Sequence, residues 1–258
     1  SIQIVSLGDD KTLYDYNSQK LLMPASTNKL YTCAAALHYL GNDHRFKTQV
    51  LARKSNLILR GGADPDLTID KLDSLSIEVS KKYKNIDTLF VDDSFLDSLN
   101  YGEGWMWDEG AWWYAAPISA LSINDNCVNF YIEPGPLGQN ASINYFPETS
   151  YINVSNKSLT VNDTLDFKKI RIDRDWVNSK NDFTIRGEIM DTAKIDTFYR
   201  NINNPTTFVG TIFKELLEKN GSTVKHLSTI SKNFSISKSY GGSAKMISAC
   251  IEVLSINL

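Results

Sequence analysis

The sequence predicts an α+β fold in which helix-rich segments at both ends of the chain enclose a β-rich middle. Apolar residues follow a helical period most clearly at 26–40, and again at 203–219 and 244–254. From 129 to about 173, Asn, Ser, Thr, Ile, Val and Tyr alternate in the manner of short strands. Neither an internal repeat nor a low-complexity linker separates these regions. This order predicts one domain that is split by a β-rich insertion.

Composition places the chain among ordinary globular proteins and excludes several functional classes. Its 258 residues are 42% hydrophobic and 22% charged, and the net charge of −3 leaves no basic field for nucleic acid. No apolar stretch reaches the ~18 residues that a transmembrane helix needs, and the first residues show no signal-peptide pattern. The three cysteines (Cys33, Cys127 and Cys250) lack zinc-site spacing, so we expect them to be small core residues.

Two elements are expected at the N-terminus. Residues 2–7 alternate between apolar and polar with one change of phase, and an extended pattern resumes at 12–14 after a turn at Gly8, which predicts a hairpin. The helix at 26–40 follows, with Ser26 at the N-cap position and Gly41 as the C-terminal stop.

Shorter elements follow along the chain. Strands are expected at 46–51, 57–59 and 88–91, a helix at 70–83, and a turn at 61–65. Residues 101–121 contain an unusual aromatic cluster bracketed by glycines, whose simplest interpretation is core or interface packing. Its members are Trp105, Trp107, Trp112, Trp113 and Tyr114.

A Ser-x-x-Lys sequence at the start of the first helix carries the strongest catalytic signal. Residues three apart share one helix face, so Lys29 can reach the hydroxyl of Ser26. Ser26 is then the candidate nucleophile and Lys29 the candidate base, and the helix N-terminus favours negative charge on the serine oxygen. Two other Ser-x-x-Lys sequences begin at Ser222 and Ser235, but only the first follows a proline and opens a helix of small residues. The alternative for Ser26 is a plain helix N-cap.

The surroundings of Ser26 resemble the active-site segment of penicillin-binding proteins, and most closely the low-molecular-mass class C D-alanyl-D-alanine carboxypeptidase/endopeptidases. The resemblance begins with Pro-Ala-Ser-Thr-Asn-Lys-Leu at 24–30 and continues at 46–48, 61–65, 104–109 and 120–126. Ala63 stands where that group usually has a third glycine. The resemblance implies a transpeptidase-like domain, an antiparallel sheet with flanking helices, that is interrupted by inserted domains. It therefore divides the chain into 1–60 and 206–258 in that domain and 61–205 in the insertion.

The family also requires a Ser-x-Asn motif, which relays protons and holds the substrate amide. Ser255 and Asn257 are the preferred candidates, because they come late in the chain and directly behind the helix expected at 244–254. Ser122 and Asn124 are the alternative, although their place within a landmark of the insertion favours a structural turn.

The family's third motif, Lys-Thr-Gly, does not occur in this sequence. Since its place would come after residue 258, we expect the chain to be truncated, to turn over peptide poorly and to be acylated poorly by penicillin. A non-catalytic cell-wall-binding protein and a serine β-lactamase are the alternatives.

The resemblance also implies the substrate and the location. It points to peptidoglycan stem peptides and β-lactams as ligands, to a periplasmic or other extracytoplasmic location, and to no cofactor. Asp108 and Glu109 are candidates for recognising the free amine that diamino acids carry in many stem peptides.

Overall fold

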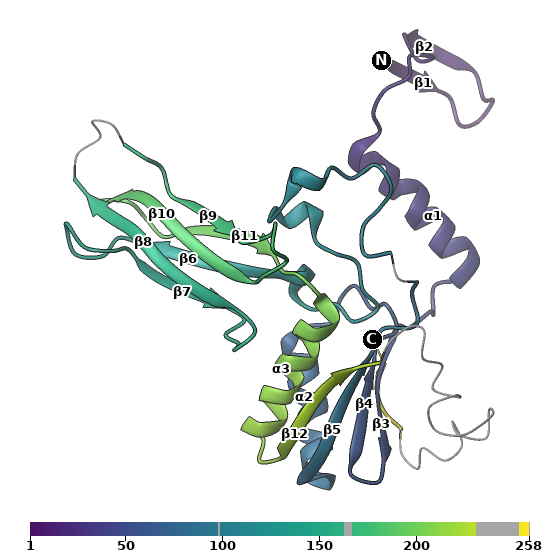
Figure 1. Cartoon of the computed structure of the whole chain (residues 1–258). Coiled ribbons are helices and arrows are strands. Elements are labelled where there is room, and N and C mark those ends of the chain that lie inside the picture. The colour runs from purple at the N-terminus through teal and green to yellow at the C-terminus, as the bar shows by residue number, and fades with distance from the viewer. Residues whose placement is uncertain (98, 163–166, 231–252, 258) are drawn as a thin grey trace. The chain divides into compact units, whose positions relative to one another are not determined.

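A computed structural model describes residues 1–97, 99–162, 167–230 and 253–257 of the chain. Contacts divide the chain into two compact units, Ser1–Arg45 and Phe46–Leu258, and each is described by itself. Figure 1 labels most of the helices and strands of both units.

The first unit contains the predicted hairpin and the predicted helix. Strand β1 (Ile2–Val5) pairs antiparallel with β2 (Thr12–Tyr16), and the register shifts between Ile4 and Val5, where the sequence pattern changes phase. A 3₁₀ turn, η1 (Ala25–Thr27), leads into helix α1 (Asn28–Leu40). The helix ends at Gly41, whose φ of +79° is the left-handed value that favours glycine at this position. The apolar face of α1 is exposed, so this unit has no core of its own.

A five-stranded mixed sheet organises the second unit. Its strand order is β12-β5-β4-β3-β13, with β4, β5 and β12 mutually parallel and β3 antiparallel to both of its neighbours. The strands are β3 (Lys47–Arg53), β4 (Asn56–Arg60), β5 (Asn85–Asp92), β12 (Thr223–Thr229) and β13 (Val253–Asn257). The predicted strands at 46–51, 57–59 and 88–91 are thereby confirmed.

Two helices connect the parallel strands and pack against each other beside the sheet (Figure 1). Helix α2 (Ile69–Lys82) begins at Thr68, whose hydroxyl accepts a hydrogen bond from the Lys71 N–H. Helix α3 (Pro205–Lys219) begins at Asn204, with proline in its first turn. Their apolar faces join the sheet residues in one buried core. The helices predicted at 70–83 and 203–219 are confirmed.

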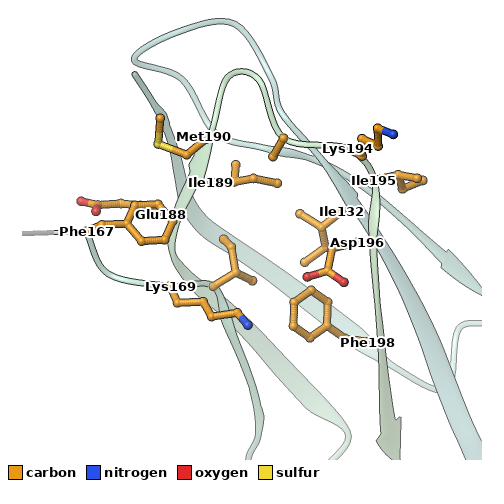
Figure 2. Close-up of a pocket in the computed structure, with 12 residues that line it drawn as sticks. Ile132, Phe167, Lys169, Glu188, Ile189, Met190, Lys194, Ile195, Asp196 and Phe198 are labelled. Atoms are coloured by element: carbon orange, nitrogen blue, oxygen red, sulfur yellow. The ribbon is translucent and has the colours of Figure 1, made fainter. Parts of the chain in front are cut away.

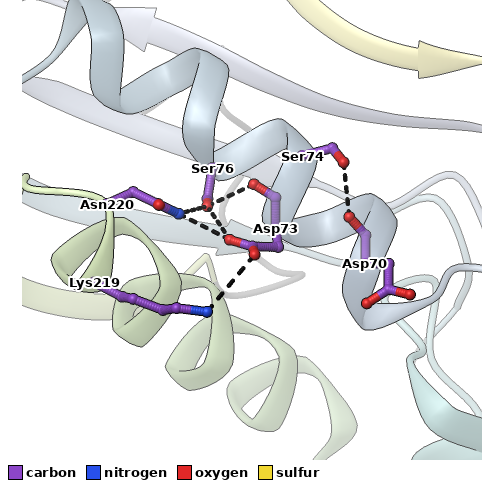
Figure 3. Close-up of polar contacts among 6 residues, drawn as sticks. All are labelled: Asp70, Asp73, Ser74, Ser76, Lys219 and Asn220. Atoms are coloured by element: carbon purple, nitrogen blue, oxygen red, sulfur yellow. Dashed lines mark hydrogen bonds and ion pairs between the residues drawn. The ribbon is translucent and has the colours of Figure 1, made fainter.

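Polar side chains tie the end of α3 to α2 (Figure 3). The Asn220 amide donates to the Asp73 carboxylate and to the Ser76 hydroxyl, at 2.8 Å each. Lys219 Nζ lies 3.8 Å from the other Asp73 oxygen. Because Asn220 and Asp73 are only partly exposed, these bonds fix the angle between the helices.

The predicted β-rich middle is confirmed as two three-stranded sheets. One has the order β11-β6-β7, with β6 (Cys127–Glu133), β7 (Ser142–Phe146) and β11 (Asp196–Asn201) antiparallel. The other has the order β8-β10-β9, with β8 (Asn153–Val161), β9 (Arg171–Arg174) and β10 (Asp182–Met190). Phe130 and Phe183, one from each sheet, pack with ring centroids 5.1 Å apart in the core between them.

The prediction of a helix at 244–254 is wrong for its last two residues. Val253 and Leu254 belong to β13, where they pair with Leu51 and Val50 of β3. Residues 244–252 lie outside the described part. The physical reason is that a short apolar run suits a strand as well as a helix, and the edge of β3 offers backbone partners.

Strands from all three predicted segments meet in the five-stranded sheet: β3 and β4 from 1–60, β5 from 61–205, and β12 and β13 from 206–258. Contacts place the division between the two units after Arg45. The domain boundaries derived from the resemblance stay predictions.

Candidate active site

Ser26 and Lys29 are brought together at the start of α1, as their spacing predicts. Lys29 Nζ lies 3.4 Å from Ser26 Oγ, within donating distance of the hydroxyl, and both side chains are exposed. Ala25, directly before the serine, has a φ of +44°, a left-handed value that is unfavourable for alanine. Backbone strain of this kind is frequent at functional positions.

The prediction that Ser26 occupies the N-cap is wrong by one residue. Ser26 lies inside η1, and Thr27 is the N-cap of α1. The Thr27 hydroxyl donates to the Pro24 carbonyl at 2.5 Å and does not cap the helix. Because the turn tightens into a 3₁₀ geometry before the α-helix begins, the Ser26 hydroxyl is left to face Lys29.

A second Ser-x-x-Lys sequence is structural. Ser222 is buried, and its hydroxyl donates to the Tyr83 carbonyl at 2.7 Å. Lys225, its partner in the motif, pairs instead with Asp87 at 2.7 Å. The third, at 235–238, lies outside the described residues.

The two Ser-x-Asn candidates lie in different settings. The Ser122 hydroxyl donates to the Ser119 carbonyl at 2.9 Å, and the Asn124 amide donates to the Cys127 carbonyl at 2.8 Å. Both bonds close a local loop, as expected of a structural turn. Ser255 and Asn257 lie in β13, opposite Gln49 and Lys47 of β3. Most of the helix expected in front of them, 244–252, lies outside the described residues.

The aromatic cluster is exposed, so the core part of its expected core or interface packing is wrong, and the interface part stays a prediction. Trp107 is 79% exposed and Trp113 is 56% exposed, although both lie in short 3₁₀ turns, η2 (Trp107–Glu109) and η3 (Trp113–Ala115). Asp108 and Glu109 belong to η2 and line a cavity of about 570 Å³ beside β9 and β11. The sequence shows the cluster, and the expectation of buried rings rested on how often tryptophan is buried in proteins.

Sequence reasoning missed the polar residues that hold this aromatic segment. The Asn201 amide, at the end of β11, lies 3.0, 2.8 and 3.0 Å from the carbonyl oxygens of Gly110, Trp112 and Ala115. Arg200 donates to the Ile172 carbonyl at 2.7 Å and lies 4.6 Å from the centre of the Trp112 ring. An arginine at the end of a strand is usually exposed, so only the fold could show that it supports the segment.

An apolar cavity of about 280 Å³ opens between β10, β11 and the approach to β9 (Figure 2), and it shares Lys169, Ile170 and Phe198 with the larger cavity. Ile132, Ile189 and Phe198 line its interior, and Glu188 and Lys194 lie at its rim (Figure 2). None of the site residues predicted from the sequence lines this cavity.

Two kinds of site are absent from the described residues. These residues contain no group of three His, Cys, Asp or Glu side chains placed to hold a metal ion. Within the same residues, no helix combines the length and apolar character that spanning a membrane requires.

The cysteines divide into two environments. Cys127 is buried, as predicted, and Cys33 is exposed on α1, against the prediction. Burial, and next the nearby Asp125 carboxylate, raise the pKa of the Cys127 thiol to about 12. Cys250 lies outside the described residues.

Comparison with known proteins identifies the family. The model of the D-Ala-D-Ala carboxypeptidase 3 (S13) family matches residues 1–238. This chain belongs to that family. The family resemblance found in the sequence is therefore confirmed. The matched residues include Ser26, Lys29 and the aromatic segment.

The names of curated relatives agree with this assignment. The chain is 29% identical over 240 residues to the D-alanyl-D-alanine carboxypeptidase of an Actinomadura species, a match that covers 87% of this chain and 44% of the relative. It is 33% identical over 138 residues to the D-alanyl-D-alanine carboxypeptidase DacB of Haemophilus influenzae, covering 50% of this chain and 28% of the relative. This S13 chain thus spans less than half the length of both relatives.

Solved structures support the fold. The crystal structure of penicillin binding protein 4 from Haemophilus influenzae matches with a TM-score of 0.76 at 22% identity, over 90% of this chain and 53% of that one. A second structure of that protein, complexed with a β-lactam, matches with a TM-score of 0.65 at 21% identity, over 89% and 50% of the two chains. The S13 chain therefore has the mixed α and β fold of this penicillin-binding protein across most of its described length.

Proposed function

We propose that this chain belongs to a serine-type D-Ala-D-Ala carboxypeptidase or endopeptidase that forms an acyl-enzyme on Ser26. The observation that carries the proposal is the 3.4 Å approach of Lys29 Nζ to Ser26 Oγ in a chain of the S13 family. The similar penicillin binding protein 4 of Haemophilus influenzae, whose structure was solved in complex with a β-lactam, supports a β-lactam as a ligand of this chain.

The proposed reaction uses the two side chains in sequence. Ser26 Oγ attacks the carbonyl carbon of the terminal D-Ala-D-Ala bond while its proton passes to Lys29 Nζ. That proton is then transferred to the departing amine of D-alanine, and the new ester joins Ser26 to the shortened stem peptide. Water hydrolyses the ester and restores the Ser26 hydroxyl. Peptide cross-links are cleaved by the same steps when the leaving amine belongs to a second stem peptide.

Ser255 and Asn257 remain the proposed second motif of this site. Their sequence context late in the chain supports the proposal, and both residues lie in strand β13. The proposed substrate lies outside the cytoplasmic membrane, so we also propose an extracytoplasmic location.

Asp108 and Glu109 are proposed to recognise the free amine of a diamino acid in the stem peptide. Their position on the wall of one cavity supports this role, because their carboxylates can pair with an ammonium group in competition with the arginines that line the same cavity. In the protein produced from its full reading frame, Glu109→Gln should abolish the preference for stem peptides with a free amine over N-acetylated ones. Unchanged selectivity would contradict the role.

Labelling with fluorescent penicillin tests the nucleophile. In the protein produced from its full reading frame, we expect one penicilloyl adduct on the peptide that contains Ser26, identified by mass spectrometry. Ser26→Ala should abolish the adduct, whereas Ser235→Ala, which alters another Ser-x-x-Lys sequence, should retain it. The 258-residue chain alone should label poorly, because the sequence lacks Lys-Thr-Gly. An adduct that survives Ser26→Ala, or no adduct in the full-frame protein, would refute the proposal.

A further inference from the structure

One buried side chain holds the loop at 110–115, which directly follows the two candidate carboxylates. Asn201, at the end of β11, is 1% exposed, and its amide nitrogen lies within 3.0 Å of three carbonyl oxygens of this loop. They belong to Gly110, Trp112 and Ala115. An amide nitrogen has two hydrogen atoms, so at least one of them is shared between two carbonyls. The main-chain N–H of Asn201 donates to a fourth carbonyl of the loop, that of Ala111, at 3.0 Å.

The orientation of this amide is set from its other side. Asn201 Oδ1 accepts a hydrogen bond from Arg174 Nη2 at 3.0 Å, and Arg174 Nη1 donates to the Lys180 carbonyl at 2.9 Å. The amide oxygen therefore faces a donor while the amide nitrogen faces acceptors, and only one orientation satisfies both. A carboxylate of the same size would still accept from Arg174 but would repel the carbonyls. An alanine would leave both sides without a partner.

The loop in turn fixes the position of η2, the three-residue turn that carries the carboxylates. This turn has no side-chain cap and is too short to be stable by itself. The Trp112 N–H donates to the Glu109 carbonyl at 3.1 Å, so the backbone of Glu109 is bonded to a residue that Asn201 holds. Gly110 lies between them with a φ of +56°, and a Cβ there would lie 2.9 Å from Nε1 of the Trp176 indole. The turn therefore has little room to shift.

The anchor of the loop belongs to a sheet. Strand β11 pairs with β6, where Asn201 lies opposite Cys127, and Arg200 forms an isolated antiparallel bridge with Trp112. On the other side of the loop, the carboxylates line the 570 Å³ cavity together with residues 171–174 of β9. The bonds of Asn201 thus set how far the carboxylates stand from the opposite wall of that cavity.

We propose that Asn201 is a positioning residue for amine recognition: by holding the loop at 110–115, it places the carboxylates of Asp108 and Glu109 at the cavity wall. This inference deepens the proposed function and rests on the proposed role of these two carboxylates. Asn201 does not itself line the cavity, so it acts through the loop and without contact to the substrate.

The relative affinity for two stem peptides tests the proposal. One peptide carries the free amine of its diamino acid, and in the other that amine is acetylated. Both are titrated calorimetrically into the protein produced from its full reading frame with Ser26→Ala, which cannot turn them over. Adding Asn201→Ala should weaken binding about tenfold more for the peptide with the free amine, which is the size of one charged hydrogen bond. A merely structural role would weaken the binding of both peptides equally.

Asn156→Ala is the matched control. Asn156 is a half-buried asparagine in β8 whose amide donates to the Ala141 carbonyl at 2.9 Å, and it does not line the cavity. Its affinity ratio should stay within about twofold of the parent protein. Circular dichroism confirms that the variants fold. If Asn201→Ala does not fold, Gly110→Ala displaces the same loop through its unfavourable φ, and should lower the ratio in the same direction.

A double-mutant cycle with Glu109→Gln completes the test. If Asn201 acts through Glu109, adding Asn201→Ala to Glu109→Gln should lower the affinity ratio no further. Equal weakening for both peptides, an unchanged ratio in the folded loop variant, or additive effects in the cycle would overturn the inference.

The outcomes for the two proposals differ. A preference that is lost in Glu109→Gln but kept in Asn201→Ala refutes the positioning role alone. A preference that survives Glu109→Gln, or no preference in the parent protein, refutes the role of the carboxylates and this inference with it. The penicillin adduct on Ser26 is measured separately, so its absence with the expected affinity ratios refutes only the proposed nucleophile.

Discussion

Ala63 occupies a left-handed backbone position in the turn between β4 and α2, and its replacement by glycine tests how that turn is stabilised. Its φ is +57°, and its N–H donates to the Ala120 carbonyl at 3.0 Å. The same turn contains Gly61 and Gly62, which approach neighbouring backbone closely. A Cβ at Gly62 would lie 2.3 Å from the carbonyl oxygen of Lys47.

The expected effect of Ala63→Gly is a small stabilisation. Alanine in a left-handed conformation costs ~1–2 kcal/mol, and glycine removes that cost. Two effects oppose this gain. Glycine raises the conformational entropy of the unfolded chain, which costs ~0.4–1 kcal/mol of stability, and loss of the half-buried methyl group costs about 0.4 kcal/mol of burial. The free energy of unfolding should therefore rise by about 0.5 kcal/mol. Gly62→Ala should lower it by about 2 kcal/mol or more, because the clash is with backbone that cannot turn away.

Urea unfolding followed by tryptophan fluorescence measures both changes. All five tryptophans lie between 105 and 176, so the signal reports the second unit. The slope of the free energy with urea should stay constant while the midpoint moves in opposite directions for the two variants. If Ala63→Gly lowers stability as much as Gly62→Ala does, the turn is limited by packing around the Ala63 methyl group and the argument from φ is refuted.

Two further predictions concern titrating groups. Burial alone would raise the pKa of Asp92, but hydrogen bonds from Ser94 and Arg60 outweigh it and hold the pKa below its ordinary value. A lowered folded-state pKa gives stability that is present above the unfolded pKa and lost as the pH falls through the folded pKa. Asp92→Asn should thus cost about 2–3 kcal/mol at pH 7 and progressively less below pH ~4, measured by urea unfolding; a cost independent of pH would contradict this. A maleimide at pH 7 should modify the exposed Cys33 within minutes and leave the buried Cys127 intact, as peptide mass mapping will show, and equal modification would disprove the difference.

Local sequence signals predicted the elements that depend on neighbouring residues. Gly41 ends α1 because a left-handed stop needs no distant partner, and the distance between Ser26 and Lys29 follows from helical spacing alone. The pairing of β13 with β3 joins residues about two hundred positions apart, and nothing local marks it. Short apolar runs such as Val253 and Leu254 take the structure that their partner offers.

The sequence identified Trp105, Trp107 and Glu109, but not their exposure or the buried residues that lie behind them. Tryptophan is buried more often than not, so the cluster at 105–113 favours a core until the fold shows its exposure. Arg174 and Asn201 lie on different strands and meet only through sheet topology, which places a buried guanidinium behind exposed rings. An alternating polar pattern does not distinguish an arginine that faces solvent from one that faces a cavity.

For the proposed nucleophile Ser26, the contact with Lys29 is formed, but the surrounding apolar face of α1 is exposed. Leu30 is 72% exposed and Leu37 is 60% exposed on the helix that carries Ser26, in a unit of 45 residues that is too small for an independent core. Amines accept protons from weak acids such as serine more readily where apolar surroundings or a neighbouring cation disfavour the charged amine. Burial of this face of α1 is therefore a condition for catalysis, separate from the 3.4 Å contact between Lys29 and Ser26. The spacing of the motif supplies the geometry, and the reactivity of Ser26 depends on what covers Leu30 and Leu37.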